Sequence, residues 1–187
     1  MTTCTELRDA FLAALAGATD AGQAVYSPFD WPTAPTSYPL MLIDWHTEEK
    51  KSLGRNAPLF TVTTVIQVIA RTKAVAQVGD AGSTVARAAA ERLKQQIERA
   101  VIGNPAVMAH PDGTQRIQQF ESVHSELLTS SEGEMPMAEL VMAFRVEFVQ
   151  GPDDFFPIRS TPVEGFDGRV QMPEGTVEPV FSINFPS

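Results

Sequence analysis

Cysteine, long apolar runs and signal-peptide features are scarce or missing in this chain of 187 residues. Cys4 is its single cysteine, which excludes an intrachain disulfide. No apolar run approaches the roughly 20 residues that a membrane-spanning helix requires. The N-terminal residues include Glu6, Arg8 and Asp9, where a signal peptide would be apolar. We therefore expect neither a membrane protein nor one that is secreted through a signal peptide.

Short motifs with a readable chemistry are also missing. The sequence contains no GxxxxGK[ST], GxGxxG, CxxC or HExxH pattern, so the common nucleotide-binding and zinc-binding motifs are excluded. Nothing in the sequence places a histidine and an orienting group beside Cys4, as a nucleophilic thiol would need. We interpret Cys4 as an incidental thiol. We expect no catalytic residue, no cofactor and no metal, and therefore predict that the protein is not an enzyme.

Basic residues are scarce in the last third of the chain. Residues 1–120 hold eleven acidic and eleven basic residues, whereas residues 121–187 hold twelve acidic and three basic ones, so the net charge of −9 arises entirely in the latter. Phosphate contacts need clustered lysine and arginine. This distribution argues against sequence-specific binding of nucleic acid.

Hydrophobic spacing indicates two helices. Thr3 and Glu6 have the spacing of a capping box, and apolar residues then recur at helical intervals up to Leu15. A longer helix is predicted over residues 80–102, where Val85 opens an apolar stripe and the opposite face is charged.

Alternating and buried-looking runs indicate strands. The predicted strands are Val25–Tyr26, the run 38–46 with its apolar middle 40–43, the alternating run 59–71, and the runs 116–128 and 137–150. We expect residues 47–58 to form a polar loop. The fold class is therefore predicted as α+β, with a mixed, largely antiparallel sheet and two main helices packed on it.

After Gln150 the composition changes. Residues 151–187 carry six prolines, no helical periodicity and several isolated phenylalanines. We expect a domain over residues 1–150 and an extended, acidic C-terminal arm over residues 151–187 that packs along the domain or reaches a neighbour. The alternative is a disordered tail, against which the five phenylalanines argue. The candidate interface residues are those with aromatic rings that need a pocket, together with two adjacent acids: Trp31, Asp153, Asp154, Phe155, Phe156, Phe166, Phe181 and Phe185.

One alternating set offers a rival interpretation. Asp44, His46 and Glu48 would point to one face of a regular strand, which is a possible geometry for metal ligands. The simpler interpretation is a strand end that enters a polar loop. The rival function is a small metal-dependent enzyme that uses these three residues.

The order of these elements resembles a known family. A short helix leads to Val25-Tyr26, a proline-rich crossing over residues 27–32 and the Pro39-led apolar strand. The alternating strand, the long helix and two closing strands follow. This order is similar to that of the tail terminator (tail completion) proteins of long-tailed bacteriophages, over about residues 5–150. The arm 151–187 is a departure from the shorter members.

The resemblance implies a structural role. Members of that family form a mixed sheet with helices against it and assemble as a hexameric ring on the end of the tail tube. The ring halts tube growth and offers a surface to the head. The implied partners are further copies of the chain, the tail tube protein and the head–tail connector protein. The implied location is the tail end of the virion, after assembly in the host cytoplasm. DNA would pass through the ring, and we hypothesise that part of the acid excess in residues 121–187 faces that channel. A head–tail connector or neck protein of the same particle is the alternative.

Overall fold

The computed structural model describes residues 2–27, 38–55, 58–77, 81–130, 135–155, 165–169 and 180–184. The chain divides into two compact units, Met1–Phe155 and Phe156–Ser187. The domain boundary predicted from the sequence, after Gln150, falls at the end of the last strand of the first unit.

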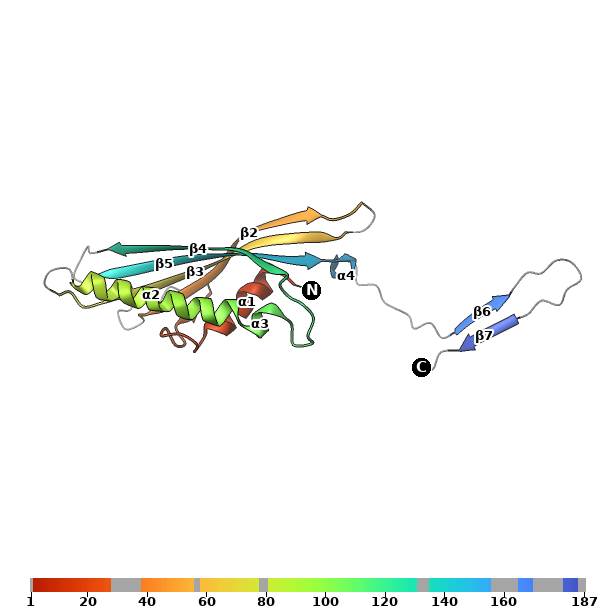
Figure 1. Cartoon of the computed structure of the whole chain (residues 1–187), viewed down its shortest axis with the longest axis horizontal. Helices are drawn as coiled ribbons and strands as arrows, with labels where there is room; N and C mark the ends of the chain where they lie inside the picture. The colour runs from red at the N-terminus through yellow and green to blue at the C-terminus, as the bar shows by residue number, and fades with distance from the viewer. Residues whose placement is uncertain are drawn as a thin grey trace, which may run out of the picture. The chain divides into compact units, whose positions relative to one another are not determined.

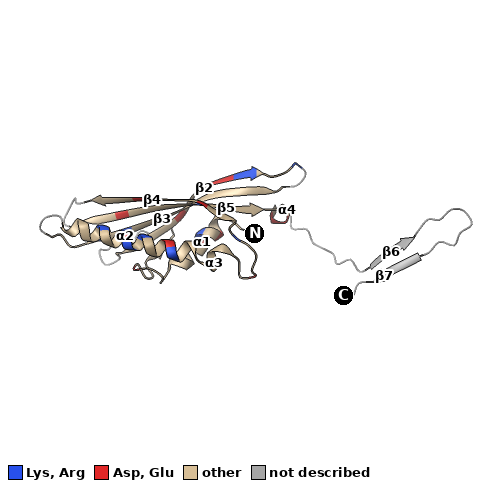
Figure 2. Ribbon diagram, in the orientation of Figure 1, with Lys and Arg blue, Asp and Glu red and all other residues tan. Residues whose placement is uncertain are grey.

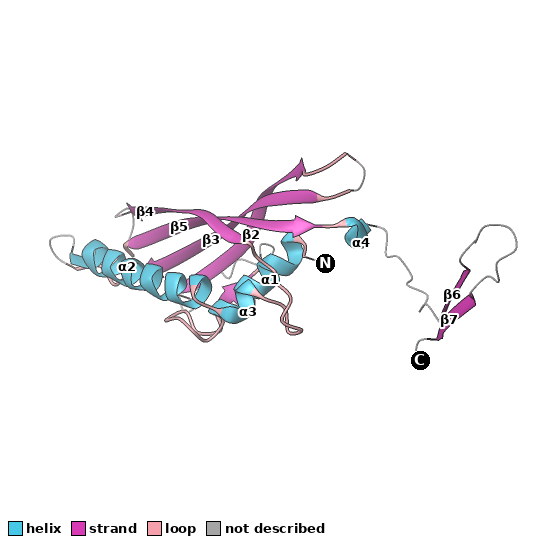
Figure 3. Cartoon of the chain, turned by 45° about the vertical axis from the view of Figure 1, so that its right-hand side comes forward, coloured by secondary structure: helices cyan, strands magenta, loops and turns pink. Residues whose placement is uncertain are grey.

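The first unit contains a five-stranded sheet with helices on one face (Figure 1). The strand order is β1 (Val25–Tyr26), β2 (Leu40–Ser52), β3 (Phe60–Lys73), β5 (Met137–Gln150) and β4 (Gln119–Ser130). Only the short β1–β2 pair is parallel, and the other three pairs are antiparallel. Helices α1 (Cys4–Leu15) and α2 (Ala81–Ile102) pack against the sheet, as the view in Figure 3 shows. The predicted α+β class, with a mixed, largely antiparallel sheet and two main helices, is confirmed.

The two central strands alternate between a buried face and a half-buried face, on which Arg145 is exposed. Residues with even numbers are buried from Val62 to Thr72 in β3 and from Ala138 to Gln150 in β5, because they face the helices. The register joins these residues directly across the pair, for example Ile66 with Phe144. We call this the covered face and the opposite side the open face.

Helix α1 begins as the sequence predicts. The side chain of Thr3 accepts a hydrogen bond from the backbone N–H of Glu6 at 3.1 Å, which satisfies one free amide of the first turn. Phe11 is fully buried, and its ring meets the ring of Phe144 edge to face, with centroids 5.4 Å apart.

Helix α2 lies close to the sheet because small residues face it. The hydroxyl of Thr72 donates a buried hydrogen bond of 2.7 Å to the carbonyl oxygen of Ala86. The buried stripe contains Gly82, Ala86, Ala90, Leu93, Ile97 and Val101. The prediction that Val85 opens this stripe is wrong, because Val85 is 51% exposed and Ala86 takes the inward position.

Strand β2 is longer than the sequence predicts. It continues to Ser52, so the first half of the predicted polar loop 47–58 is strand instead. Thr47 to Ser52 pair with β3 from Val65 back to Phe60. This backbone pairing extends the strand although its side chains here are exposed and polar. A β-bulge at His46, between Trp45 and Thr47, shifts the register.

The second unit contains one described element, an antiparallel pair formed by β6 (Gly165–Arg169) and β7 (Val180–Asn184).

Two short helices complete the described structure of the first unit. They are α3 (Pro105–Met108) and α4 (Pro152–Phe155).

Candidate functional site

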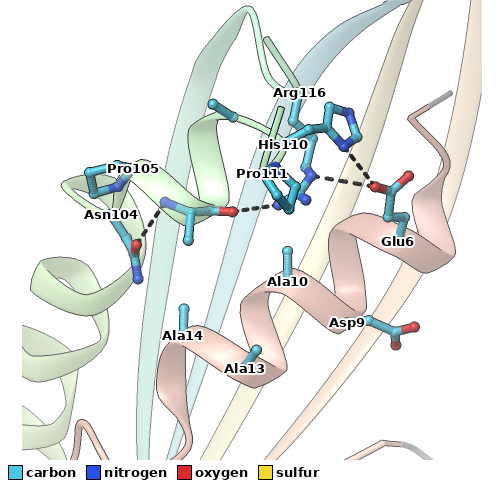
Figure 4. A pocket seen from close by; sticks show the side chains of 12 residues that line it. Glu6, Asp9, Ala10, Ala13, Ala14, Asn104, Pro105, His110, Pro111 and Arg116 are labelled. Carbon is cyan, nitrogen blue, oxygen red and sulfur yellow. Dashed lines mark hydrogen bonds and ion pairs between the residues drawn. The ribbon is translucent and has the colours of Figure 1, made fainter. Parts of the chain in front are cut away.

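A charged cluster joins the start of α1 to the segment that follows α3 (Figure 4). The Glu6 carboxylate lies 3.0 Å from Nδ1 of His110 and 3.6 Å from Nε of Arg116. Nη1 of Arg116 also donates a hydrogen bond to the carbonyl oxygen of Ala106. On its other side, Nε2 of His110 lies 3.1 Å from the hydroxyl of Thr2. The cluster therefore fastens the N-terminus of the chain to residues more than a hundred positions away.

The burial of Arg116 strengthens its interaction with the Glu6 carboxylate. The side chain of Arg116 is only 9% exposed, while that of Glu6 is 35% exposed. A guanidinium at that depth needs a nearby negative charge, because an unpaired buried charge is strongly destabilising. Nε of Arg116 has no hydrogen-bond partner among the described atoms, so its compensation comes from the Glu6 charge.

Beside the cluster lies an open groove of about 710 Å³ between α1 and α3. Its walls are mostly small apolar residues, and Figure 4 shows Ala10, Ala13 and Ala14 on α1 beneath Pro105. The Asn104 side chain caps α3 by accepting from the Ala106 N–H at 3.0 Å. Most of the groove surface is apolar. Its charged residues are those of the cluster at one end, together with Asp9.

Cys4 lies inside the core. It is 5% exposed, and burial raises the pKa of its thiol above the usual value. The nearby Glu48 carboxylate raises it further, while Thr64 acts in the opposite direction. A buried thiol with a raised pKa is a poor nucleophile.

Three predicted interface residues lie in or at the end of α4. Asp154 accepts a hydrogen bond of 2.7 Å from the backbone N–H of Gly151 through its carboxylate, whereas Asp153 is exposed. The half-buried ring of Phe155 meets the ring of Phe60 edge to face, with centroids 5.7 Å apart. Nζ of Lys50 lies 5.4 Å from the centre of the Phe155 ring. Phe155 therefore ties the end of the first unit to β2 and β3.

The remaining predicted interface residues are not brought into a described site. Trp31, Phe156 and Phe185 lie outside the described residues. Phe166 and Phe181 are placed by backbone register alone, in β6 and β7.

The rival metal site does not have the expected geometry. Asp44 pairs with Gln67 and Glu48 pairs with Thr64, positions on opposite faces of β3. The bulge at His46 causes this, since one extra residue inverts the alternation. The prediction that the three side chains share a face is wrong. His46 instead hydrogen-bonds the side chain of Gln67, and the described residues contain no group of three potential metal ligands.

The open face of the sheet is a mixed surface. Half-buried Val65, Ile69 and Val141 form its centre. Charged pairs lie around them, with Arg71 2.5 Å from Glu139 and Arg145 2.6 Å from Glu121. Near the end of β2, where Figure 2 shows acidic followed by basic residues, Glu49 and Lys51 pair with Thr63 and Thr61 on this face.

Among the described residues, both long edges of the sheet lack a partner strand over most of their length. Strand β1 covers only Met41 and Leu42 of β2, and β4 pairs only with β5 among the described strands. A strand edge presents free N–H and C=O groups that can pair with another chain. The sheet therefore has two distinct edges for neighbours, β2 on one side and β4 on the other.

Sequence reasoning missed the cluster of Glu6, His110 and Arg116. Residues His110 to Gly113 form a turn that is closed by a hydrogen bond of 2.9 Å from the Gly113 N–H to the His110 carbonyl oxygen. The lone basic residue Arg116 after this turn was the available signal, but no local pattern connects it with Glu6.

Comparison with known proteins does not assign a family. No family model matches the chain, and no curated protein matches its sequence. Within the described residues, no helix is both long and apolar enough to cross a membrane. Among solved structures, a chain from the virion of a native gene transfer agent (GTA) particle aligns with a TM-score of 0.34 and 18% identity, over 73% of this chain and 84% of that chain. Likeness at this level assigns neither a family nor a function.

Proposed function

We propose that this chain is a structural protein of a phage-like virion. In this proposal it assembles as a hexameric ring on the end of a tail tube, stops tube polymerisation and presents the surface that joins the head. Its partners are other copies of itself, the tail tube protein and the head–tail connector protein.

The observation that carries the proposal is the pair of different open edges on one sheet. A subunit with unlike surfaces on opposite sides can meet its neighbours head to tail, and such contacts close into a ring when the rotation between subunits is right. The β2 edge and the β4 edge lie on opposite sides of β3 and β5, and in the proposed ring they are the two unlike surfaces through which neighbours meet.

The order of elements gives further support. The short first helix, the brief β1, the apolar start of β2, the long helix α2 and the closing pair β4–β5 follow the order on which the tail-terminator resemblance rests. The sheet with helices on one face is the architecture that this resemblance implies.

The proposed role is not enzymatic. Cys4 lies in the core with a raised pKa, and the bulge at His46 separates Asp44 from Glu48. The polar cluster at Glu6 holds together distant parts of the fold, which accounts for its charges without a reaction.

A tube-capping experiment tests this role. Purified protein is added to tail tube protein during polymerisation, and tube lengths are measured by electron microscopy. We expect shorter tubes that carry a ring at one end, with an effect that saturates at six copies per tube. Unchanged tube lengths together with binding to isolated head–tail connectors would instead assign the protein to the neck.

A further inference from the structure

The groove between α1 and α3 has the form of a docking site for a short piece of chain. Its volume of about 710 Å³ lies in the range of pockets that bind ligands, and its alanine side chains leave room for a larger apolar one (Figure 4). The side chain of Arg116 at one end is nine-tenths buried, and its Nε has no hydrogen-bond partner among the described atoms. A carbonyl oxygen of an incoming chain would satisfy this donor.

The accessible charge of the groove is negative. The side chains of Asp9 and Glu6 are 59% and 35% exposed. Those of Arg116 and His110 are only 9% and 16% exposed. Because charges across an interface are arranged to complement one another, the groove favours an occupant that carries basic side chains next to an apolar one.

The tip of the β2–β3 hairpin has this chemistry. Leu53 follows the last residue of β2 and is 57% exposed. Among the large apolar side chains that are exposed in the described part of the chain, it is the one with a basic residue two positions away on each side, Lys51 and Arg55. Both of these are exposed. The tip therefore matches the groove in polarity and in charge.

The tip of one chain does not reach the groove of the same chain. The backbone N–H of Leu53 donates a hydrogen bond of 2.9 Å to the carbonyl oxygen of Leu59, which fixes the tip in the hairpin. Glu48 pairs with Thr64, whose side chain lies against Cys4 at the start of α1. Leu53 is five residues further along β2, or about 17 Å, and Figure 3 shows this end of β2 and β3 projecting beyond α1. Bending the tip back would unpair that end of the sheet, so the matching groove is that of another copy.

We propose that the β2–β3 hairpin of one copy inserts Leu53 into the α1–α3 groove of the next copy, with its two basic residues beside the groove carboxylates. This inference rests on the proposed ring and specifies a contact between its subunits. The hairpin ends the β2 side of the sheet, and the groove is bordered by residues 104–116, which lead into β4. The contact therefore joins the same two sides of the subunit as the ring, and each copy donates one tip and accepts one.

Mixing a tip variant with a groove variant of the full chain tests the contact. Leu53→Glu disables the tip and keeps the groove, whereas Ala13→Lys blocks the groove and keeps the tip. Both positions are exposed, so the fold should survive, as circular dichroism can check. The matched controls are Val85→Glu and Ala88→Lys, at exposed positions on α2. Association is measured by sedimentation velocity at equal concentrations.

We expect each contact variant alone to associate at least about tenfold more weakly than wild type, and the two controls to match wild type. An equimolar mixture of the two contact variants should form 1:1 complexes and nothing larger, because one intact tip meets one intact groove and no further copy can add. Rings of normal mass from either variant would overturn the contact but leave the proposed ring intact. Wild-type dimers that both variants dissolve would support the contact and contradict the ring. A wild type that stays monomeric, on tube ends as well, would count against both.

Cross-linking reads the same contact directly. Copies with Gly54→Cys are mixed with copies with Ala13→Cys and treated with a short bis-maleimide. A side chain at Gly54 meets no other atom within 4 Å, and Cys4 is buried and stays in place. We expect covalent heterodimers from this mixture and none when Ala88→Cys replaces Ala13→Cys. Assembled protein that yields no such heterodimer would contradict the contact.

Discussion

Replacing Glu6 with glutamine removes the negative charge that compensates the buried guanidinium of Arg116. The substitution keeps the size of the side chain, so the change is mainly electrostatic. Removing one partner of a fully buried ion pair costs about 3–5 kcal/mol. Glu6 is 35% exposed and lies 3.6 Å from Nε of Arg116, which reduces this contribution to roughly 1–2 kcal/mol. Loss of a favourable charge in the first turn of α1 adds about 0.3–1 kcal/mol. We expect Glu6→Gln to lower the free energy of unfolding by about 2 kcal/mol at neutral pH.

The measurement is urea unfolding followed by far-UV circular dichroism at one fixed protein concentration, since self-association also contributes to stability. The control is Asp9→Asn, which removes a charge from the same helix. Asp9 is 59% exposed and pairs with its neighbour Arg8, so its loss should cost less than about 1 kcal/mol. In a double-mutant cycle, Glu6→Gln combined with Arg116→Met should cost less than the sum of the two single changes. Additive costs, or equal losses for Glu6→Gln and Asp9→Asn, would refute the assignment.

Three further outcomes are expected. Gly82→Ala should lower the free energy of unfolding by about 1–3 kcal/mol in urea titration, because the new Cβ would lie 2.7 Å from the carbonyl oxygen of Val75 and 2.9 Å from Cγ of Pro136; a stability equal to wild type would show that the segment before α2 yields easily. Cys4 should react with a thiol reagent only at the rate of unfolding, as absorbance measurements in native buffer and in urea can show; rapid reaction in native buffer would contradict its burial. Deletion of residues 156–187 should leave circular dichroism of the first unit nearly unchanged and weaken self-association in light scattering; global unfolding would show that these residues belong to the core.

The regular elements could be predicted from the sequence because their patterns are strong. Strand β5 runs from Met137 to Gln150, as predicted, since its alternation is uninterrupted. The apolar run from Leu40 to Ile43 is buried at every residue, also as predicted. Local pattern sufficed in both cases because burial in the structure repeats the pattern of apolar residues in the sequence. Every second residue is buried in β5, and every residue is buried from Leu40 to Ile43.

Local pattern failed where a partner strand decides the structure. Residues 47–52 look like a polar loop but continue β2, because β3 provides hydrogen bonds along the whole length. The bulge at His46 has no sequence signature of its own, and it inverts the faces of Asp44 and Glu48. Val85 looked like a core residue, but the close approach of α2 to Thr72 admits the smaller Ala86 instead.

The candidate site could be predicted only in part. The sequence pointed to Phe155 as an aromatic that needs a pocket, and its ring contacts Phe60. The cluster of Glu6, His110 and Arg116 could not be anticipated, because it depends on how α1 docks beside the turn after α3. The role of the other interface candidates stays a prediction.

The mass of the assembled protein tests the central claim most directly. Native mass spectrometry of the full chain, alone and on tail tube ends, should show a closed species of six copies of the 20.3 kDa chain and, in electron microscopy, a ring. A species that stays monomeric at high concentration and on tube ends, or that forms symmetric dimers, would contradict the account.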